Sequence, residues 1–232
     1  SIIVVFFASG IRWVLGCVRI VKIAFLFGAT FAYDAYLVAF AIPEMVAGLL
    51  VGVIAVTFIP IFCEYLSKEG EVKAWDFASN LINIIFVVGL SLTILMIGIA
   101  PFIVRIVAPG FNDKTFQLAV QLITIIFPLV LIISLAELIT RILHTYQRFV
   151  LPILSTVFEV IVVIICLLFL SEKYGIFSLA FGLLLGAVVR LLIQLPLLWE
   201  KFKYYRLSLN VRLPGIRRVN LIAGPLISCM LF

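Results

Sequence analysis

Long apolar stretches alternate with short polar clusters along this chain, and proline or glycine marks several of the boundaries. A membrane-spanning helix needs about 20 mostly apolar residues, and every stretch but the last reaches that length. The pattern therefore predicts an all-α integral membrane protein. Its six transmembrane helices and the start of a seventh are expected at residues 2–27, 31–66, 75–106, 115–143, 150–170, 176–199 and 220–232.

Composition narrows the class of protein further. Hydrophobic residues make up 66% of the chain and charged residues 12%, against about 25% charged in soluble domains. The net charge of +6 does not indicate nucleic acid, because the basic residues are not interleaved with aromatic ones on polar segments. Membrane lipids are the expected partners. The chain has one histidine, four scattered cysteines and no catalytic motif, so neither an enzyme nor a metal or other cofactor is expected.

The distribution of Lys and Arg between the loops predicts the orientation in the membrane, because cytoplasmic loops carry the excess. Loops on one side hold ten, at positions 68, 73, 141, 148, 201, 203, 206, 212, 217 and 218, and those on the other hold three, at 105, 114 and 173. The amino terminus is therefore expected in the cytoplasm. The chain divides into a bundle (1–203), a basic cytoplasmic linker (204–219) and a truncated helix (220–232). The linker either fixes the topology alone or also binds acidic lipid heads or a partner.

Three basic residues interrupt the first apolar stretch. Arg12 and Arg19 are seven residues apart and Lys22 follows three later, so all three fall along one helical face. Charges inside a membrane segment are costly and usually face a partner or a watery cavity. Phosphate or pyrophosphate suits such a face, because guanidinium groups bind oxyanions bidentately. Alternatively, Lys22 reaches the membrane surface and Arg12 pairs with a nearby carboxylate.

Two acids are candidates for a gate or for ion coupling. Asp34 lies at the start of the second span, where it caps the helix or stabilises its first turn, and it could also form a salt-bridge latch. Glu44 follows Pro43 deeper in the membrane, where a carboxylate needs a cation, a proton or water. One expected partner of Glu44 is Arg19.

Later spans carry further buried charges. Glu137 and Arg141 are four residues apart with the acid first, which favours an ion pair within one helix. Glu159 has no local partner, and Arg190 is a candidate. Polar residues also recur on the third and fourth spans, where they either line a cavity or join helices, at Ser79, Asn80, Asn83, Gln117 and Gln121.

The order of several short motifs resembles the MurJ (MviN) lipid II flippase family. The first motifs are Val14-Leu15-Gly16-Cys17-Val18-Arg19, Phe27-Gly28-Ala29, Asp34-Ala35-Tyr36-Leu37-Val38-Ala39-Phe40 and Ile42-Pro43. Later ones are Phe58-Ile59-Pro60, Ala108-Pro109-Gly110-Phe111, Tyr146-Gln147-Arg148-Phe149 and Gln194-Leu195-Pro196. The resemblance spans nearly the whole chain and corresponds to the amino-terminal half of the family's fold.

The resemblance implies one lobe of a two-bundle exporter of the multidrug/oligosaccharidyl-lipid/polysaccharide superfamily. Such a protein would move the undecaprenyl-pyrophosphate-linked peptidoglycan precursor across the bacterial cytoplasmic membrane by alternating access. By the same resemblance, Arg19 would bind the pyrophosphate and Asp34 would help to latch the outer gate. The carboxy-terminal lobe, or a second copy, would supply the opposite wall of the cavity.

The chain also departs from the family pattern. Trp13 stands where family members usually have an arginine, with Arg12 one residue earlier, and Glu44 begins a run that lacks the usual arginine pair. Two further functions are therefore considered. One is export of another polyprenyl-linked saccharide, and the other is a non-transporting membrane scaffold with the same fold.

Overall fold

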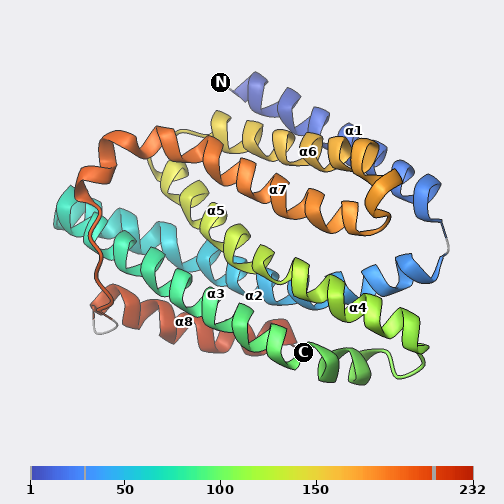
Figure 1. The fold of residues 1–232 in the computed structure, drawn as a ribbon. Coiled ribbons are helices and arrows are strands. Elements are labelled where there is room, and N and C mark those ends of the chain that lie inside the picture. Colours follow the sequence, from blue (N-terminus) through green and yellow to red (C-terminus); the bar gives the residue numbers. More distant parts are fainter. Residues whose placement is uncertain (1, 29, 211–212, 232) are drawn as a thin grey trace.

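The computed structural model describes residues 2–28, 30–210 and 213–231, without the side chains of residues 2, 220 and 225–231. Helices dominate this part of the chain, and no strand occurs in it (Figure 1). The α-helices are α1 (Ile2–Phe27), α2 (Phe31–Lys68), α3 (Glu71–Val107), α4 (Asp113–Ile126), α5 (Pro128–Thr145), α6 (Val150–Tyr174), α7 (Phe177–Gln194) and α8 (Pro214–Leu231). A 3₁₀ helix, η1 (Leu195–Tyr204), follows α7.

Six helical segments within the described residues are long and apolar enough to cross a membrane. They are Ile3–Phe27, Phe31–Lys68, Glu71–Val107, Asp113–Thr145, Val150–Tyr174 and Phe177–Tyr204. This number confirms the six spans predicted from the apolar stretches. The protein is a multi-pass membrane protein.

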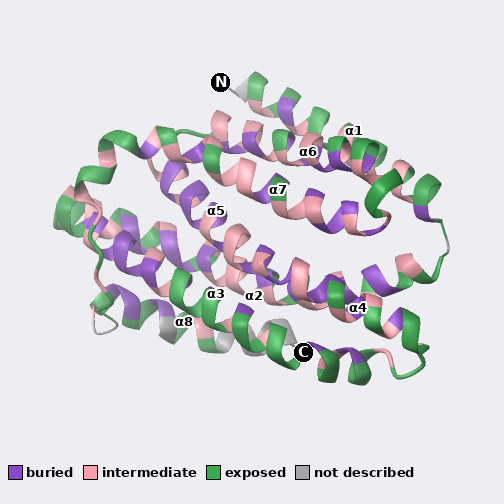
Figure 2. Cartoon of the chain, in the orientation of Figure 1, coloured by how far each residue is buried: buried purple, intermediate pink, exposed green. Residues whose placement is uncertain are grey.

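Helix α5 runs diagonally through the middle of the bundle (Figure 1). It packs against α2 and α3 on one side and against α7 on the other, and α1 joins the bundle mainly through α6. The residues of α5 are accordingly largely buried, whereas α1 has only Ala8 and Phe27 buried among its described side chains (Figure 2). The first helix therefore lies at the edge of the bundle, with one side against α6.

The fourth predicted span is divided into two helices. The sequence predicts one helix over 115–143, but α4 ends at Ile126 and α5 begins at Pro128. Proline has no amide hydrogen to donate, and its ring clashes with the preceding turn, so a helix commonly breaks or bends there. Phe127, at the junction, is 1% exposed. The side chain at the break is therefore packed into the core.

Other boundaries also differ from those expected. Helix α3 begins at Glu71 rather than near residue 75, and the sixth span continues beyond Gln194 as a 3₁₀ helix. The last helix begins at Pro214 rather than near Asn220, which agrees with the preference for proline in a first helical turn. Only the short segment 205–213 therefore separates η1 from α8.

Residues 205–210, which we call the strap, are attached to α3 by hydrogen bonds. The Asn83 amide nitrogen donates to the carbonyl oxygens of Arg206 at 3.2 Å and Ser208 at 2.9 Å. Its amide oxygen accepts from the Tyr205 hydroxyl at 2.5 Å. Ser79 accepts from the Arg206 amide at 3.2 Å. The polar residues of α3 therefore bind the basic linker rather than line a cavity.

Ion pairs hold the same basic region against α2 and α3. Arg206 lies 3.7 Å from Asp76, Arg218 lies 2.7 Å from Glu64, and Lys201 pairs with Glu71. Arg212, one of the basic residues counted for orientation, lies outside the described residues. Two linker charges, and that of Lys201 just before the linker, are thus paired within the protein, which reduces the charge available to lipid heads.

A half-buried tyrosine, Tyr146, supports this end of the bundle. The Tyr146 hydroxyl accepts a hydrogen bond from the Trp75 indole at 3.0 Å and donates one to Glu71 at 3.0 Å. Burial raises the pKa of Tyr146 to about 12, so the hydroxyl keeps its proton at neutral pH and remains a donor. The α5–α6 turn is thereby joined to the start of α3.

We expect Asn83→Ala to release the strap, because Asn83 is 8% exposed and makes three hydrogen bonds to it. The measurement is hydrogen–deuterium exchange of the purified protein, which should become faster over residues 205–210. Ser91→Ala, an exposed change on the same helix, is the control and should leave this exchange unchanged. Unchanged strap exchange in Asn83→Ala would contradict the attachment.

Candidate functional site

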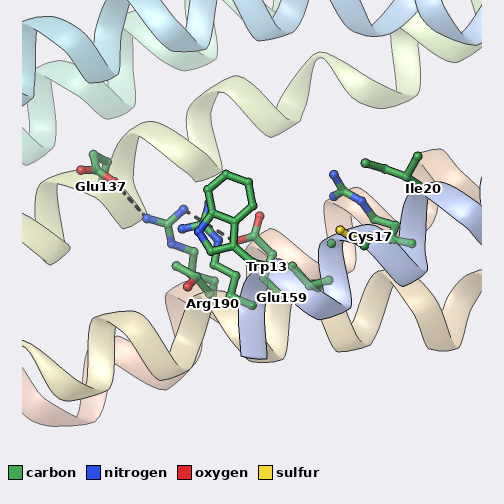
Figure 3. Close-up of a pocket in the computed structure, with 11 residues that line it drawn as sticks. Trp13, Cys17, Ile20, Glu137, Glu159 and Arg190 are labelled. Carbon is green, nitrogen blue, oxygen red and sulfur yellow. Dashed lines mark hydrogen bonds and ion pairs between the residues drawn. The ribbon is translucent and has the colours of Figure 1, made fainter. Parts of the chain in front are cut away.

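A cavity of about 480 Å³ lies between α1 on one side and α5, α6 and α7 on the other (Figure 3). Its charged lining consists of three arginines and two glutamates, a net positive set. Both arginines of α1 that the sequence singled out belong to it. The five charged residues are Arg12, Arg19, Glu137, Glu159 and Arg190.

The helical period of α1 explains how its residues reach the cavity. Arg12 and Arg19 are two turns apart, so they lie along one face, as their spacing predicts. Trp13 lines the cavity beside Arg12 although its side chain is 77% exposed in this structure. This aromatic residue therefore contributes to the same cavity wall as Arg12.

The three residues on the other wall are joined by ion pairs. Arg190 of α7 lies 2.9 Å from Glu137 of α5 and 3.6 Å from Glu159 of α6. Glu137 is also paired with Arg141 at 2.5 Å, which confirms the predicted pair within one helix. Figure 3 shows Arg190 between the two acids. Both cavity carboxylates therefore already have cationic partners.

Arg19 has an unsatisfied donor. The residue is half-buried, and its Nε atom is buried without a hydrogen-bond partner in the described structure. Neither Arg12 nor Arg19 forms an ion pair with any described residue. The Nε atoms of Arg141 and Arg190 are likewise buried without a partner, but both of these side chains form ion pairs and Arg19 does not. Because buried polar groups normally find partners, an unpaired arginine in a cationic cavity is suited to bind an anion.

The other predicted site residues lie elsewhere. Lys22 is half-buried on α1 but does not line this cavity. Asp34 is exposed in the first turn of α2, whose N-cap is Thr30. Glu44 is exposed and lines a separate, mostly apolar pocket of about 230 Å³ between α2 and α5. Across the described residues, the expected pair between Glu44 and Arg19 is not formed.

The sequence did not place Glu137, Glu159 and Arg190 in the same site as the arginines of α1. It identified them as charges within spans, which is the signal that marks functional candidates in a membrane protein. Their convergence on one cavity depends on how three helices pack. No group of three metal-ligating side chains occurs in the described part of the chain, and the free cations favour an anionic ligand over a metal.

Comparison with solved structures defines the class of fold. The chain superposes on "Inward-facing conformation of a multidrug resistance MATE family transporter of the MOP superfamily" with a TM-score of 0.73 at 18% identity, covering 98% of this chain and 51% of that one. It matches "Lipid II flippase MurJ, inward closed conformation" with a TM-score of 0.79 at 27% identity, covering 100% of this chain and 48% of that one. The described fold is therefore that of about half of each of these two proteins.

Sequence comparisons narrow the class to a family. The family model "Lipid II flippase MurJ" matches residues 23–231, so the chain belongs to this family. A probable lipid II flippase MurJ of Buchnera aphidicola subsp. Schizaphis graminum is 32% identical, over 97% of this chain and 45% of that protein. The lipid II flippase MurJ of Burkholderia cenocepacia is 31% identical, over 89% of this chain and 42% of that protein. The chain thus spans less than half the length of these relatives.

Proposed function

We propose that the protein containing this chain is a lipid II flippase. It would move the undecaprenyl-pyrophosphate-linked precursor of the cell wall from the inner to the outer leaflet of the bacterial cytoplasmic membrane. Family membership supports this function. The observation that carries it is the cavity in which Arg12 and Arg19 have no ion-pair partner among the described residues. Such a protein is a transporter and not an enzyme.

In this proposal Arg19 is the main pyrophosphate ligand. Its guanidinium can bind two oxygens of the anion, and Arg12 reaches the same cavity from two turns earlier. Lys22 assists by adding positive charge further along α1. Asp34, exposed at the start of α2, acts in closing the outer gate, and Glu44 acts in coupling this movement to the transport cycle.

Alternating access requires a second wall opposite this lobe. The structural match covers 48% of the solved MurJ chain, which supports a carboxy-terminal lobe in the same protein as that wall. A second copy of the chain is the alternative partner. The ten basic residues predicted on one side support a cytoplasmic amino terminus. Transport from the inner to the outer leaflet would require the cavity to load substrate from the cytoplasmic side. The two lobes would rock about the site near the membrane midplane.

The test is to deplete the full-length protein in its own bacterium and identify the lipid-linked saccharide that accumulates in the inner leaflet. We expect lipid II, measured by extraction and mass spectrometry after an added enzyme has cleaved the outer-leaflet pool. Re-expression of the protein should reverse the accumulation. Growth without any accumulated polyprenyl-linked lipid would contradict transport and favour a scaffold.

A second cargo is supported by the composition of the cavity. Trp13 occupies its wall in place of the family's usual arginine, and two carboxylates are present. These features suit a different saccharide carried on the same polyprenyl-pyrophosphate. The same depletion experiment distinguishes the two, because the other lipid-linked saccharide would then accumulate and lipid II would not.

A further inference from the structure

Arg190 connects two acidic residues of different helices in the cavity wall. It bridges acids from two other helices, 2.9 Å from Glu137 of α5 and 3.6 Å from Glu159 of α6. The side chains of Arg190 and Glu137 are each 12% exposed and that of Glu159 is 23% exposed. Glu137 has a second cationic partner in Arg141, whereas Arg190 is the only described cation within ion-pair distance of Glu159.

The neighbouring turns of α7 fix this bridge in place. Gly186, one turn before Arg190, allows α6 to approach so closely that an added Cβ would lie 2.8 Å from the Glu159 carbonyl oxygen. Gln194, one turn after it, donates to Thr140 of α5 at 3.1 Å and to Ser155 of α6 at 2.9 Å. Helix α7 thus packs closely on α6 one turn before Arg190 and is hydrogen-bonded to both α5 and α6 one turn after it.

The bridge determines which cations in the cavity remain free. A carboxylate away from bulk water needs a cationic partner, since an unpaired buried charge is costly. If Arg190 were absent, Glu159 would have no partner at ion-pair distance, and the remaining arginines lining the same cavity are Arg12 and Arg19. The acid would then compete with an incoming anion for them.

We propose that Arg190 is a positioning residue that neutralises Glu159 and so keeps Arg12 and Arg19 free for the substrate's pyrophosphate. The inference rests on the proposed function, because it assigns a role within the same anion site. It differs from a purely structural role, in which Arg190 only fastens three helices. A structural bridge fails when either partner is removed, whereas charge neutralisation fails only when the cation is removed.

The experiment measures binding of undecaprenyl pyrophosphate to the purified full-length protein in detergent. We expect Arg190→Gln to weaken binding by about tenfold, because an uncompensated Glu159 occupies the anion-binding arginines. Glu159→Gln should bind at least as tightly as the wild type. The double variant Arg190→Gln/Glu159→Gln should recover binding to within about threefold, because both members of the pair are then neutral.

Separate outcomes identify what has failed. A wild-type protein that does not bind undecaprenyl pyrophosphate would overturn the proposed function and the inference with it. Binding by the wild type and equally by Arg190→Gln would overturn the inference alone, as would a folded double variant that binds no better than Arg190→Gln. If Arg190→Gln does not fold, Glu159→Gln decides: tight binding supports neutralisation, and a tenfold loss indicates a structural bridge.

Discussion

Arg19→Ala is expected to abolish growth rescue of flippase-depleted bacteria while the variant protein still accumulates in the membrane. Arg19 lines the cavity, has a buried donor without a partner and forms no ion pair with a described residue. A hydrogen bond to a charged group contributes about 1.5–3 kcal/mol, so losing a bidentate pair would weaken binding by more than tenfold. Growth and membrane protein levels are the measurements.

Arg105→Ala is the matched control for this change. Arg105 is an exposed arginine near the end of α3, where it lies over the Phe116 ring and away from the cavity. Its removal changes the net charge by the same amount, so it should leave growth rescue intact. Full rescue by Arg19→Ala, at normal protein levels, would contradict the assignment of Arg19 as the main ligand.

Gly186→Ala is expected to lower the midpoint temperature of unfolding by several degrees. The added Cβ would lie 2.8 Å from the carbonyl oxygen of Glu159 and 3.3 Å from its Cγ, so backbone would have to move. Overpacking of this kind costs about 1–3 kcal/mol. The shift would also displace Glu159 from Arg190, so substrate binding should weaken together with stability. Thermal unfolding in detergent measures the first effect.

Gly98→Ala in α3 separates this clash from the general effect of adding a methyl group to a helical glycine. Nothing lies within 4 Å of the Cβ that would be added at Gly98. Alanine is the better helix former by about 1 kcal/mol, so the control should keep or raise the midpoint temperature. If Gly186→Ala behaves like this control, α6 and α7 are not packed as closely as described.

The number of spans was predictable from the chain itself, because the bilayer sets a length that an apolar stretch must reach. The break within the fourth span was not predicted, although Pro128 was visible in the sequence. Pro43 and Pro60 lie within a helix that continues through both. A proline ends one helix and not another depending on whether the surrounding packing compensates for the lost hydrogen bond.

Contacts between segments that are distant in the sequence could not be predicted from the hydropathy pattern either. Ser79 and Asn83 share a face of α3, which the helical period indicates. Their partners are more than 100 residues away, in the strap, and apart from the Tyr205 hydroxyl they are backbone groups with no distinguishing side-chain signal. The sequence therefore predicted a basic cytoplasmic linker but not its attachment to α3.

Hydropathy and helical period were enough to predict the membrane class, the six spans and the common face of Arg12 and Arg19, because both patterns act within one segment. The packing of the helices was needed to show that Arg190 and Glu159 share a cavity with Arg19, while Glu44 lies in another pocket. Pairing between helices depends on how they pack, and close contacts such as that at Gly186 are set in three dimensions.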